Sequence, residues 1–165
     1  SAAAWLLRAS ATRLAFQNTT RAKQAEPAPV QDRQRLVDEA LGAALEHAIT
    51  IDSVYLEQGL TIATLAKRLG APEHRLRKHI NEALGYSNFN AYVNRHRIIA
   101  AKAALRDPKL AHLPVLTIAL DSGFASLPPF NRAFRAETGQ SATAYRSVAL
   151  AEGRSVNGQI ESENS

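Results

Sequence analysis

Residues 76–85 read LRKHINEALG, and residues 130–139 repeat the outline of this stretch as FNRAFRAETG. In each copy two apolar residues stand four positions apart, so they share one face of a helix, while a basic residue between them lies on another face. A glycine follows five residues after the second apolar residue and is a common helix stop. The repeat predicts two anchored helices, each with a basic exposed side.

Each copy follows a shorter apolar helix and a turn that contains glycine. Before the first copy, Thr61 offers an N-cap for a helix over residues 62–69, which ends in a glycine turn. Before the second copy, a helix through residues 115–121 turns at Gly123, and Ser126 is the expected cap of the next helix. An alanine and a glycine stand four apart in both units, which lets two helices cross closely. The pattern predicts two helix-turn-helix units.

Two longer helices complete the expected fold. Apolar residues recur with a helical period over residues 34–56 and predict a supporting helix. Residues 88–105 predict a linker helix between the two units, about 27 Å long at about 1.5 Å per residue. We therefore expect an all-α chain of two helix-turn-helix subdomains joined by a long linker helix. Its expected parts are an N-terminal segment and linker (1–33), the double helix-turn-helix domain (34–148) and a flexible tail (149–165).

The positive charge is concentrated in the stretch that carries the repeat. The chain has 165 residues, 45% hydrophobic content and a formal charge of +5. Residues 61–148 hold 13 basic and 5 acidic residues, whereas the segments on either side are net negative. This distribution is expected of a surface that meets a polyanion such as a nucleic acid. A solvated basic surface on a helical domain is the alternative that composition leaves open.

Several chemical functions have no support in the sequence. The chain has no cysteine, which excludes a disulfide framework, a thiolate zinc site and a cysteine nucleophile. Its five histidines show no HExxH motif and no pair four residues apart, and its carboxylates are scattered. We therefore expect no enzyme activity, no cofactor and no metal site. Methionine is absent even at position 1, and we interpret the chain as a piece of a longer protein.

Three groups of residues together form a recognisable signature. The first unit contributes Leu65-Ala66 to Gly70, Leu76 to Ile80 and Gly85. The linker segment contributes Asn94 to Ala103, including Arg97-Ile98. The second unit contributes Ile118-Ala119, Gly123-Phe124, Ser126, Phe130, Arg132, Phe134, Gly139 and Tyr145-Arg146. With these residues, the stretch from about 55 to 147 resembles the DNA-binding domain of AraC/XylS-family transcription regulators.

The resemblance implies homeodomain-like units in a bacterial, sequence-specific transcription regulator. Its implied partners are double-stranded DNA with a bipartite operator, and RNA polymerase. Two departures from the family pattern matter. Ala142 stands where the family usually has proline, and Leu127-Pro128-Pro129 replaces polar residues at the start of the second recognition helix. We therefore expect the first recognition helix to carry more of the base specificity.

The resemblance also implies DNA contacts at particular positions of the two recognition helices. The expected base readers of the first helix are Glu73, His74, Arg77 and Lys78. The expected base readers of the second helix are Asn131 and Arg132. The expected phosphate contacts are Thr61, Ser126 and Arg135. Arginine and lysine suit guanine, asparagine suits adenine, and glutamate accepts a hydrogen bond from cytosine.

The linker helix sets the distance between the two units. Successive major grooves on one face of DNA lie about 34 Å apart, so a helix of about 27 Å between two recognition helices can place both without dimerisation. We expect a bipartite site that spans two adjacent grooves, with bending of the DNA. The competing interpretation is a helical protein-interaction module without DNA-binding activity. The salt dependence of binding distinguishes the two.

The family usually joins this DNA-binding domain to a separate sensing domain, which we expect on the N-terminal side. Residues 5–13 are a candidate remnant of a stretch next to a membrane domain. The expected location is the cytoplasm, with a tether to the inner membrane of the full-length protein as an open alternative. Homodimerisation of the full-length protein, the operator sequence, the effector and the sign of regulation also stay open.

Overall fold

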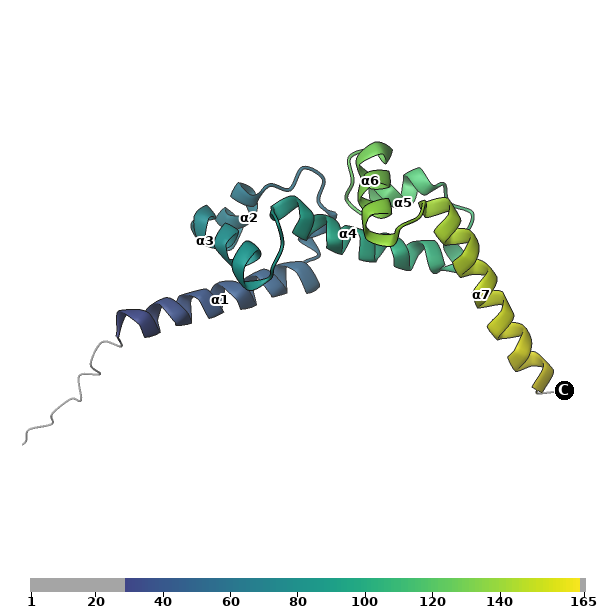
Figure 1. Cartoon of the computed structure of the whole chain (residues 1–165), viewed down its shortest axis with the longest axis horizontal. Helices are drawn as coiled ribbons and strands as arrows, with labels where there is room; N and C mark the ends of the chain where they lie inside the picture. Colours follow the sequence, from purple (N-terminus) through teal and green to yellow (C-terminus); the bar gives the residue numbers. More distant parts are fainter. Residues whose placement is uncertain (1–28, 164–165) are drawn as a thin grey trace, which may run out of the picture.

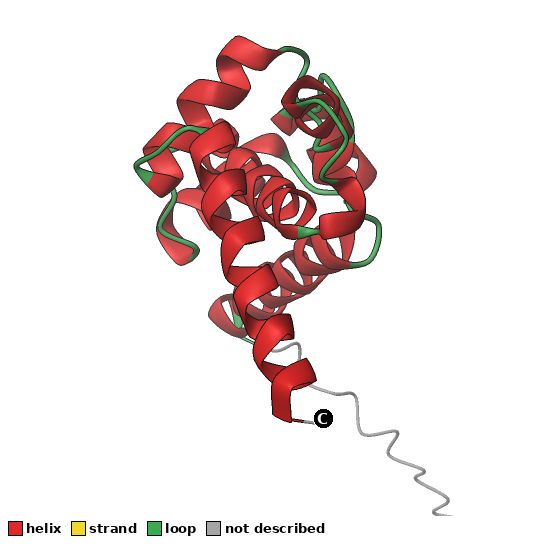
Figure 2. Cartoon of the chain, turned by 90° about the vertical axis from the view of Figure 1, so that its right-hand side faces the viewer, coloured by secondary structure: helices red, strands yellow, loops and turns green. Residues whose placement is uncertain are grey.

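Two helical units and a long helix between them make up the described part of the chain (Figure 1). A computed structural model describes residues 29–163. The helices are α1 (Val30–Thr50), α2 (Ile62–Arg68), α3 (Glu73–Lys78), α4 (Phe89–Arg106), α5 (Val115–Asp121), α6 (Leu127–Thr138) and α7 (Ala142–Glu163). Short helical turns are η1 (Val54–Leu56), η2 (His79–Ala83) and η3 (Pro108–Leu110). Residues 29–163 contain no strand, as Figure 2 shows, so the expected all-α class is confirmed.

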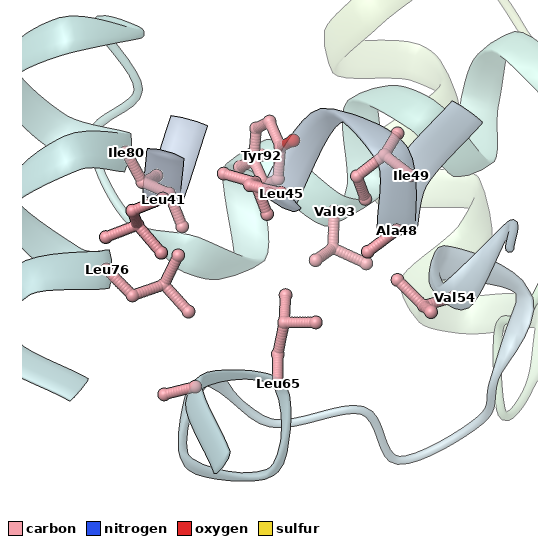
Figure 3. Packing of buried hydrophobic residues seen from close by; sticks show 11 residues of the cluster. Leu41, Leu45, Ala48, Ile49, Val54, Leu65, Leu76, Ile80, Tyr92 and Val93 are labelled. Atoms are coloured by element: carbon pink, nitrogen blue, oxygen red, sulfur yellow. The ribbon is translucent and has the colours of Figure 1, made fainter. Parts of the chain in front are cut away.

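The first core is enclosed by α1, α2, α3 and the beginning of α4. Its buried members are Leu41, Leu45, Ala48, Ile49, Val54, Leu65, Ala66, Leu76, Ile80, Tyr92 and Val93. Figure 3 shows Leu45, Leu65 and Leu76 pointing toward one another from three different helices. Burying one leucine side chain completely stabilises a fold by about 1.5–3 kcal/mol. The first helix-turn-helix unit is therefore held by leucines that come from distant parts of the chain.

The second core lies between the end of α4 and helices α5, α6 and α7. Its buried members are Ile98, Ala101, Leu105, Ile118, Ala119, Phe124, Phe130, Phe134, Ala142 and Tyr145. Phe130 lies at its centre, with its ring centroid 5.3 Å from that of Phe124 and 5.4 Å from that of Phe134. In the view of Figure 1, α2 and α3 lie to the left of α4, and α5 and α6 lie above its right-hand part. The expected arrangement of two subdomains joined by a long linker helix is confirmed.

Local hydrogen bonds explain where two of the helices begin. Thr61 Oγ1 accepts a hydrogen bond from the Thr64 amide at 3.1 Å, and Thr64 Oγ1 accepts one from the Thr61 amide at 3.1 Å. This reciprocal pair is a capping box, and it fixes the start of α2. At the start of α4, Asn88 Oδ1 accepts from the Ala91 amide at 2.9 Å. Both starts were expected from the sequence.

Two helices differ from the expected boundaries. The supporting helix was expected over residues 34–56, but α1 ends at Thr50 and a separate turn, η1, follows. Between the two, Ser53 has a left-handed backbone with φ of 51°, which a continuous α-helix does not contain. The first recognition helix was expected to continue to Leu84, but its α-helical hydrogen bonding ends at Lys78 and a single π-helical turn follows.

The first and last described helices extend beyond the boundaries expected for the central domain. Helix α1 begins at Val30, within the stretch expected to be a linker, and α7 continues to Glu163, through most of the stretch expected to be a tail. Residues 149–163 contain no proline, so each of these residues retains the amide that a helix requires. The expected N-terminal segment lies, up to residue 28, outside the described residues. Among the described helices, none combines the length and the apolar content needed to cross a membrane.

Candidate nucleic-acid interface

Helix α3 places its apolar and polar side chains on opposite sides. Leu76 and Ile80 are completely buried in the first core, which confirms the two expected anchors. The side chains of His74, Arg77 and Lys78 are exposed. Glu73, at the first position of the helix, is partly exposed. The four expected base readers of this unit therefore lie at the surface of one short helix.

Two basic side chains of α3, Arg77 and Lys78, form ion pairs on the protein surface. Arg77 forms a pair with Glu73, one turn earlier in the helix, and Lys78 Nζ lies 3.9 Å from a carboxylate oxygen of Glu82. Exposed pairs of this spacing contribute only about 0.3–0.5 kcal/mol. They hold the side chains in place without preventing an exchange for contacts with bases or phosphates.

A π-helical turn limits the length of the regular reading surface on α3. The Leu84 amide donates to the carbonyl of His79 at 3.1 Å, five residues back. The wider turn means that side chains after His79 no longer continue the face of the preceding α-helix. His79 itself packs on α1, where its ring lies 3.0 Å from the position that a Cβ would take at Gly42. Candidate base readers are therefore confined to the two turns before His79.

Helix α6 repeats the division into a buried and a polar side. Phe130 and Phe134 are completely buried, which confirms the second pair of anchors. Asn131, Arg132 and Arg135 are exposed and line one hollow, together with residues at the start of α7. Within the described part of the chain no carboxylate lies within ion-pair distance of Arg132 or Arg135. The second unit thus presents two arginines without a competing acidic partner.

Ser126 occupies the N-cap position of α6 but does not cap the helix. Its backbone is extended, as in an ordinary cap, yet its side chain makes no capping hydrogen bond. The reason is chemical: a cap accepts from the amide of the second or third helical residue, and these are Pro128 and Pro129, which have no amide hydrogen. The expected capping role is therefore wrong. The exposed Ser126 hydroxyl stays available for another partner.

The remaining candidate, Thr61, lies at the exposed start of α2. Its hydroxyl oxygen is an acceptor in the capping box. The candidate residues thus fall on two surfaces, one on α2 and α3 and one on α6. Helix α4 connects the two surfaces.

Arg97, on α4, makes contacts that the sequence pattern did not predict. Its Nε donates to the Tyr55 carbonyl at 2.6 Å, and its terminal nitrogen donates to the Glu57 carbonyl at 2.8 Å. Its guanidinium also lies 5.6 Å from the ring centroid of Phe124 in the second core. Burial lowers the pKa of Arg97. The sequence marked Arg97 as part of a family signature, but its partners lie about 40 residues away and carry no local signal.

Part of the sequence is similar to known proteins. The sequence model of a family described as a helix-turn-helix domain matches residues 65–147. The right origin-binding protein of Escherichia coli K12 is 30% identical over 92 residues, which cover 56% of this chain and 30% of that protein. The transcriptional regulator Rob of Salmonella typhimurium matches with the same values. The chain thus spans about 30% of the length of these relatives.

Solved structures show the same fold. A transcriptional regulator of the AraC-type DNA-binding group from Chromobacterium violaceum aligns with a TM-score of 0.56 and 20% identity, over 66% of this chain and 93% of that one. The C-terminal domain of AraT, a response regulator from Geobacillus stearothermophilus, aligns with a TM-score of 0.52 and 24% identity, over 68% of this chain and 84% of that one. At these identities the similarity concerns the fold alone.

Proposed function

The chain belongs to the AraC-type helix-turn-helix family of transcription regulators, and we propose from this membership that it reads a bipartite operator in double-stranded DNA. In this proposal α3 enters one major groove and α6 enters the next. One observation carries it: both short helices bury their apolar anchors completely and expose basic side chains. The 18 residues of α4 between the two units give a length of about 27 Å, which suits grooves about 34 Å apart if the DNA bends.

The first unit is proposed to supply most of the base recognition. Arg77 and Lys78 are suited to guanine, whose O6 and N7 accept two hydrogen bonds in the major groove. Glu73 is suited to a neighbouring cytosine amine, and its ion pair with Arg77, one turn later in the helix, places the two charged groups side by side. His74 is a further donor or acceptor on the same exposed side. Thr61, at the start of α2, is proposed to contact a phosphate.

The second unit is proposed to position the protein and to read fewer bases. Asn131 suits adenine and Arg132 suits guanine, but the first turn of α6 is Leu127-Pro128-Pro129 and offers no polar side chain to the groove. Arg135 and the uncapped hydroxyl of Ser126 are suited to phosphate oxygens. This division of labour follows from the chemistry of the exposed residues of each helix.

The function of the whole protein is a wider proposal. The double helix-turn-helix domain, proposed at residues 34–148, includes both cores, from Leu41 to Tyr145. We propose that a sensing domain on its N-terminal side controls DNA binding, and that regulation acts through RNA polymerase in the cytoplasm. A tether to the inner membrane and a homodimer are two further proposals for the full-length protein.

Selection of bound sequences from a random DNA pool tests the proposal directly. The selected sequences are expected to contain two conserved half-sites about one helical turn apart. Arg77→Ala and Arg132→Ala are each expected to weaken binding to the selected site by about 1–3 kcal/mol and to relax the preference at one base position. Fluorescence anisotropy on selected and scrambled DNA measures both effects.

Arg35→Ala provides a matched control. Arg35 is an exposed arginine on α1 with an acidic partner one turn away, as Arg77 has on α3, but it lies outside both recognition helices. Its replacement is expected to leave the sequence preference unchanged. If the arginine variants in α3 and α6 both bind the selected site as tightly as the unmodified chain does, the proposed readout is wrong. A pool without any enriched sequence would favour the protein-interaction module.

A further inference from the structure

The turn of the second helix-turn-helix unit touches the backbone of the first unit. A Cβ at Gly123 would lie 2.6 Å from the carbonyl oxygen of Tyr55 and 2.9 Å from the Cα of Leu56. Both atoms belong to η1, whose Val54 is buried in the first core. At such distances no side chain fits between the two backbones. The glycine therefore permits a direct contact between the two units.

The equivalent glycine of the first unit makes no such contact. Gly70 and Gly123 both have positive φ, of 64° and 89°, so the backbone turn itself favours glycine at either position. Around Gly70, however, no atom lies within 4 Å of the position of an added Cβ. The close approach at Gly123 is thus a property of the interface between the units and not of the turn alone.

Arg97, on α4, stabilises the same contact between Gly123 and η1. Its two hydrogen bonds go to the carbonyls of Tyr55 and Glu57, on either side of Leu56. Tyr55 O is therefore approached by the arginine and by Gly123 together. Because the guanidinium also lies against the ring of Phe124, a single side chain contacts the backbone of the first unit and the core of the second.

A separate ion pair holds α6 to the linker helix. Arg95, two residues before Arg97, pairs with Glu137 near the end of α6. A rotation of the second unit about the axis of α4 would have to break this pair, the contact of Arg97 with the Phe124 ring and the close approach of Gly123 to η1. The orientation of α6 relative to α3 is thus constrained by more than the continuity of α4.

We propose that the inter-unit joint, defined as Arg97, Gly123 and the backbone of Tyr55 to Glu57, fixes the separation of the two half-sites that the protein accepts. Arg97 is then a positioning residue that determines specificity for spacing without touching a base. The inference rests on the proposed two-groove reading. DNA turns once in about ten base pairs, so one inserted base pair rotates a half-site by about a tenth of a turn. A rigid joint cannot follow that rotation.

A spacing series tests the joint on DNA. The two selected half-sites are kept constant while zero to three base pairs are inserted or removed between them, and affinities are compared by competition. The unmodified chain is expected to lose about tenfold or more in affinity for each change of one base pair. In Arg97→Ala this loss is expected to shrink to about twofold, while the affinity for DNA with a single half-site stays the same.

Arg106→Ala is the matched control for the spacing series. Arg106 is also an α4 arginine over an aromatic ring of the second core, 5.2 Å from the centroid of Tyr145. Unlike Arg97, it forms no hydrogen bond with η1 among the described residues. Its replacement is expected to leave the steep spacing profile intact. Thermal unfolding of all variants identifies any that lose the fold.

A distance measurement tests the joint without DNA. The chain has no cysteine, so Ala63→Cys on α2 and Ala144→Cys on α7, both at exposed positions, carry spin labels that report the separation of the two units. A narrow distance distribution is expected, and Arg97→Ala is expected to broaden it. Equal widths in both proteins would overturn the joint.

The outcomes separate the joint from the proposed function. If the unmodified chain selects two half-sites but tolerates all spacings, or if Arg97→Ala keeps the steep profile, the joint is overturned and two-groove reading stands. If Arg97→Ala weakens single half-site binding as strongly as bipartite binding, its role is structural and the joint is again overturned. If no bipartite site is selected, the proposed function fails while the distance measurement still decides whether the units are locked.

Discussion

Asn88 and Ser126 stand at the same place, immediately before a helix, and behave differently. Asn88 accepts a hydrogen bond from the Ala91 amide at 2.9 Å and so satisfies one of the open amides of α4. Ser126 has no amide to accept from, because prolines occupy the positions where a cap finds its donor. The residue type therefore predicts a cap only when the residues that follow it can donate.

This difference predicts unequal effects of two similar substitutions. Asn88→Ala is expected to lower the free energy of unfolding by about 0.5–2 kcal/mol, because it removes a working cap. Ser126→Ala is expected to change it by less than about 0.5 kcal/mol, as a surface substitution does, and to weaken DNA binding if the hydroxyl contacts a phosphate. Urea denaturation and DNA titration of both variants measure these effects. Equal losses of stability would contradict the small structural role expected for the Ser126 side chain.

His96 is a titratable group in an aromatic environment on α4. Its ring centroid lies 4.9 Å from that of Tyr92 and 5.9 Å from that of Tyr55. Burial, together with the nearby positive charge of Arg95, lowers the pKa of His96 below its usual 6.5. The folded chain therefore binds a proton at this residue less readily than the unfolded chain does.

The lowered pKa predicts that acid destabilises the fold. As the pH falls through about 6.5 toward the lower folded-state value, the unfolded chain takes up a proton first, so the free energy of unfolding decreases. His96→Phe keeps a ring against both tyrosines but cannot titrate, and it is expected to reduce the fall in melting temperature between pH 7 and about 5. His47→Gln, at an exposed histidine, is the control. An unchanged pH profile in His96→Phe would contradict the assignment.

Helix α4 is the element on which the spacing of the two units depends. Its 18 residues include Tyr92 and Val93 of the first core and Ile98, Ala101 and Leu105 of the second. Ile99 follows directly after Ile98 but belongs to neither core and is 51% exposed. A change at Ile99 therefore tests the backbone of the helix with little direct effect on either core.

Proline at position 99 is expected to destabilise the fold strongly, whereas alanine is expected to have almost no effect on stability. Ile99→Pro removes a helical hydrogen bond and introduces a clash, at a cost of about 3 kcal/mol or more. It is expected to lower stability and abolish binding to the bipartite site. Ile99→Ala keeps the backbone and is expected to change stability by less than about 0.5 kcal/mol. Circular dichroism and DNA titration measure both, and an Ile99→Pro variant that still binds the bipartite site would refute the dependence on α4.

The elements of the fold were predictable because they rest on local patterns. The anchors Leu76 and Phe130, the glycine stops and the Thr61 cap each lie within a few residues of the helix that they define. The π-helical turn at His79 was not predictable, since the local pattern continues the α-helix to the glycine stop at Gly85. The hydrogen bonds of Arg97 were not predictable either, because they join residues 40 and 42 positions apart. By contrast, the failure of Ser126 to cap was visible in the two prolines.

The charge of the molecule is distributed in the way that long-range attraction to DNA requires. Residues 61–148, with 13 basic and 5 acidic residues, contain both candidate reading surfaces. Arg132 and Arg135 have no acidic partner among the described residues, whereas Arg77 and Lys78 have one each. The arginines of the second unit can therefore bind a polyanion directly. In the first unit, Arg77 and Lys78 must first give up their ion pairs with Glu73 and Glu82.

This distribution predicts a steep dependence of DNA binding on salt. Binding through phosphate contacts weakens as counterions compete at higher salt, and a clear loss of affinity between about 50 and 200 mM salt is expected. Arg135→Ala is expected to reduce the slope of log affinity against log salt by about one, equally on all sequences. Arg35→Ala is expected to leave the slope unchanged. Binding that does not respond to salt would point to a protein partner.

The sharing of α4 between the two cores also determines how the molecule unfolds. Neither core is complete without α4, because Val93 belongs to the first core and Ile98 to the second. These two residues are five positions apart in the same helix. Melting of either half would fray the helix that the other half needs. The two helix-turn-helix units are therefore expected to unfold in one cooperative transition. A chain that is cut within α4 is expected to yield two pieces that do not fold alone.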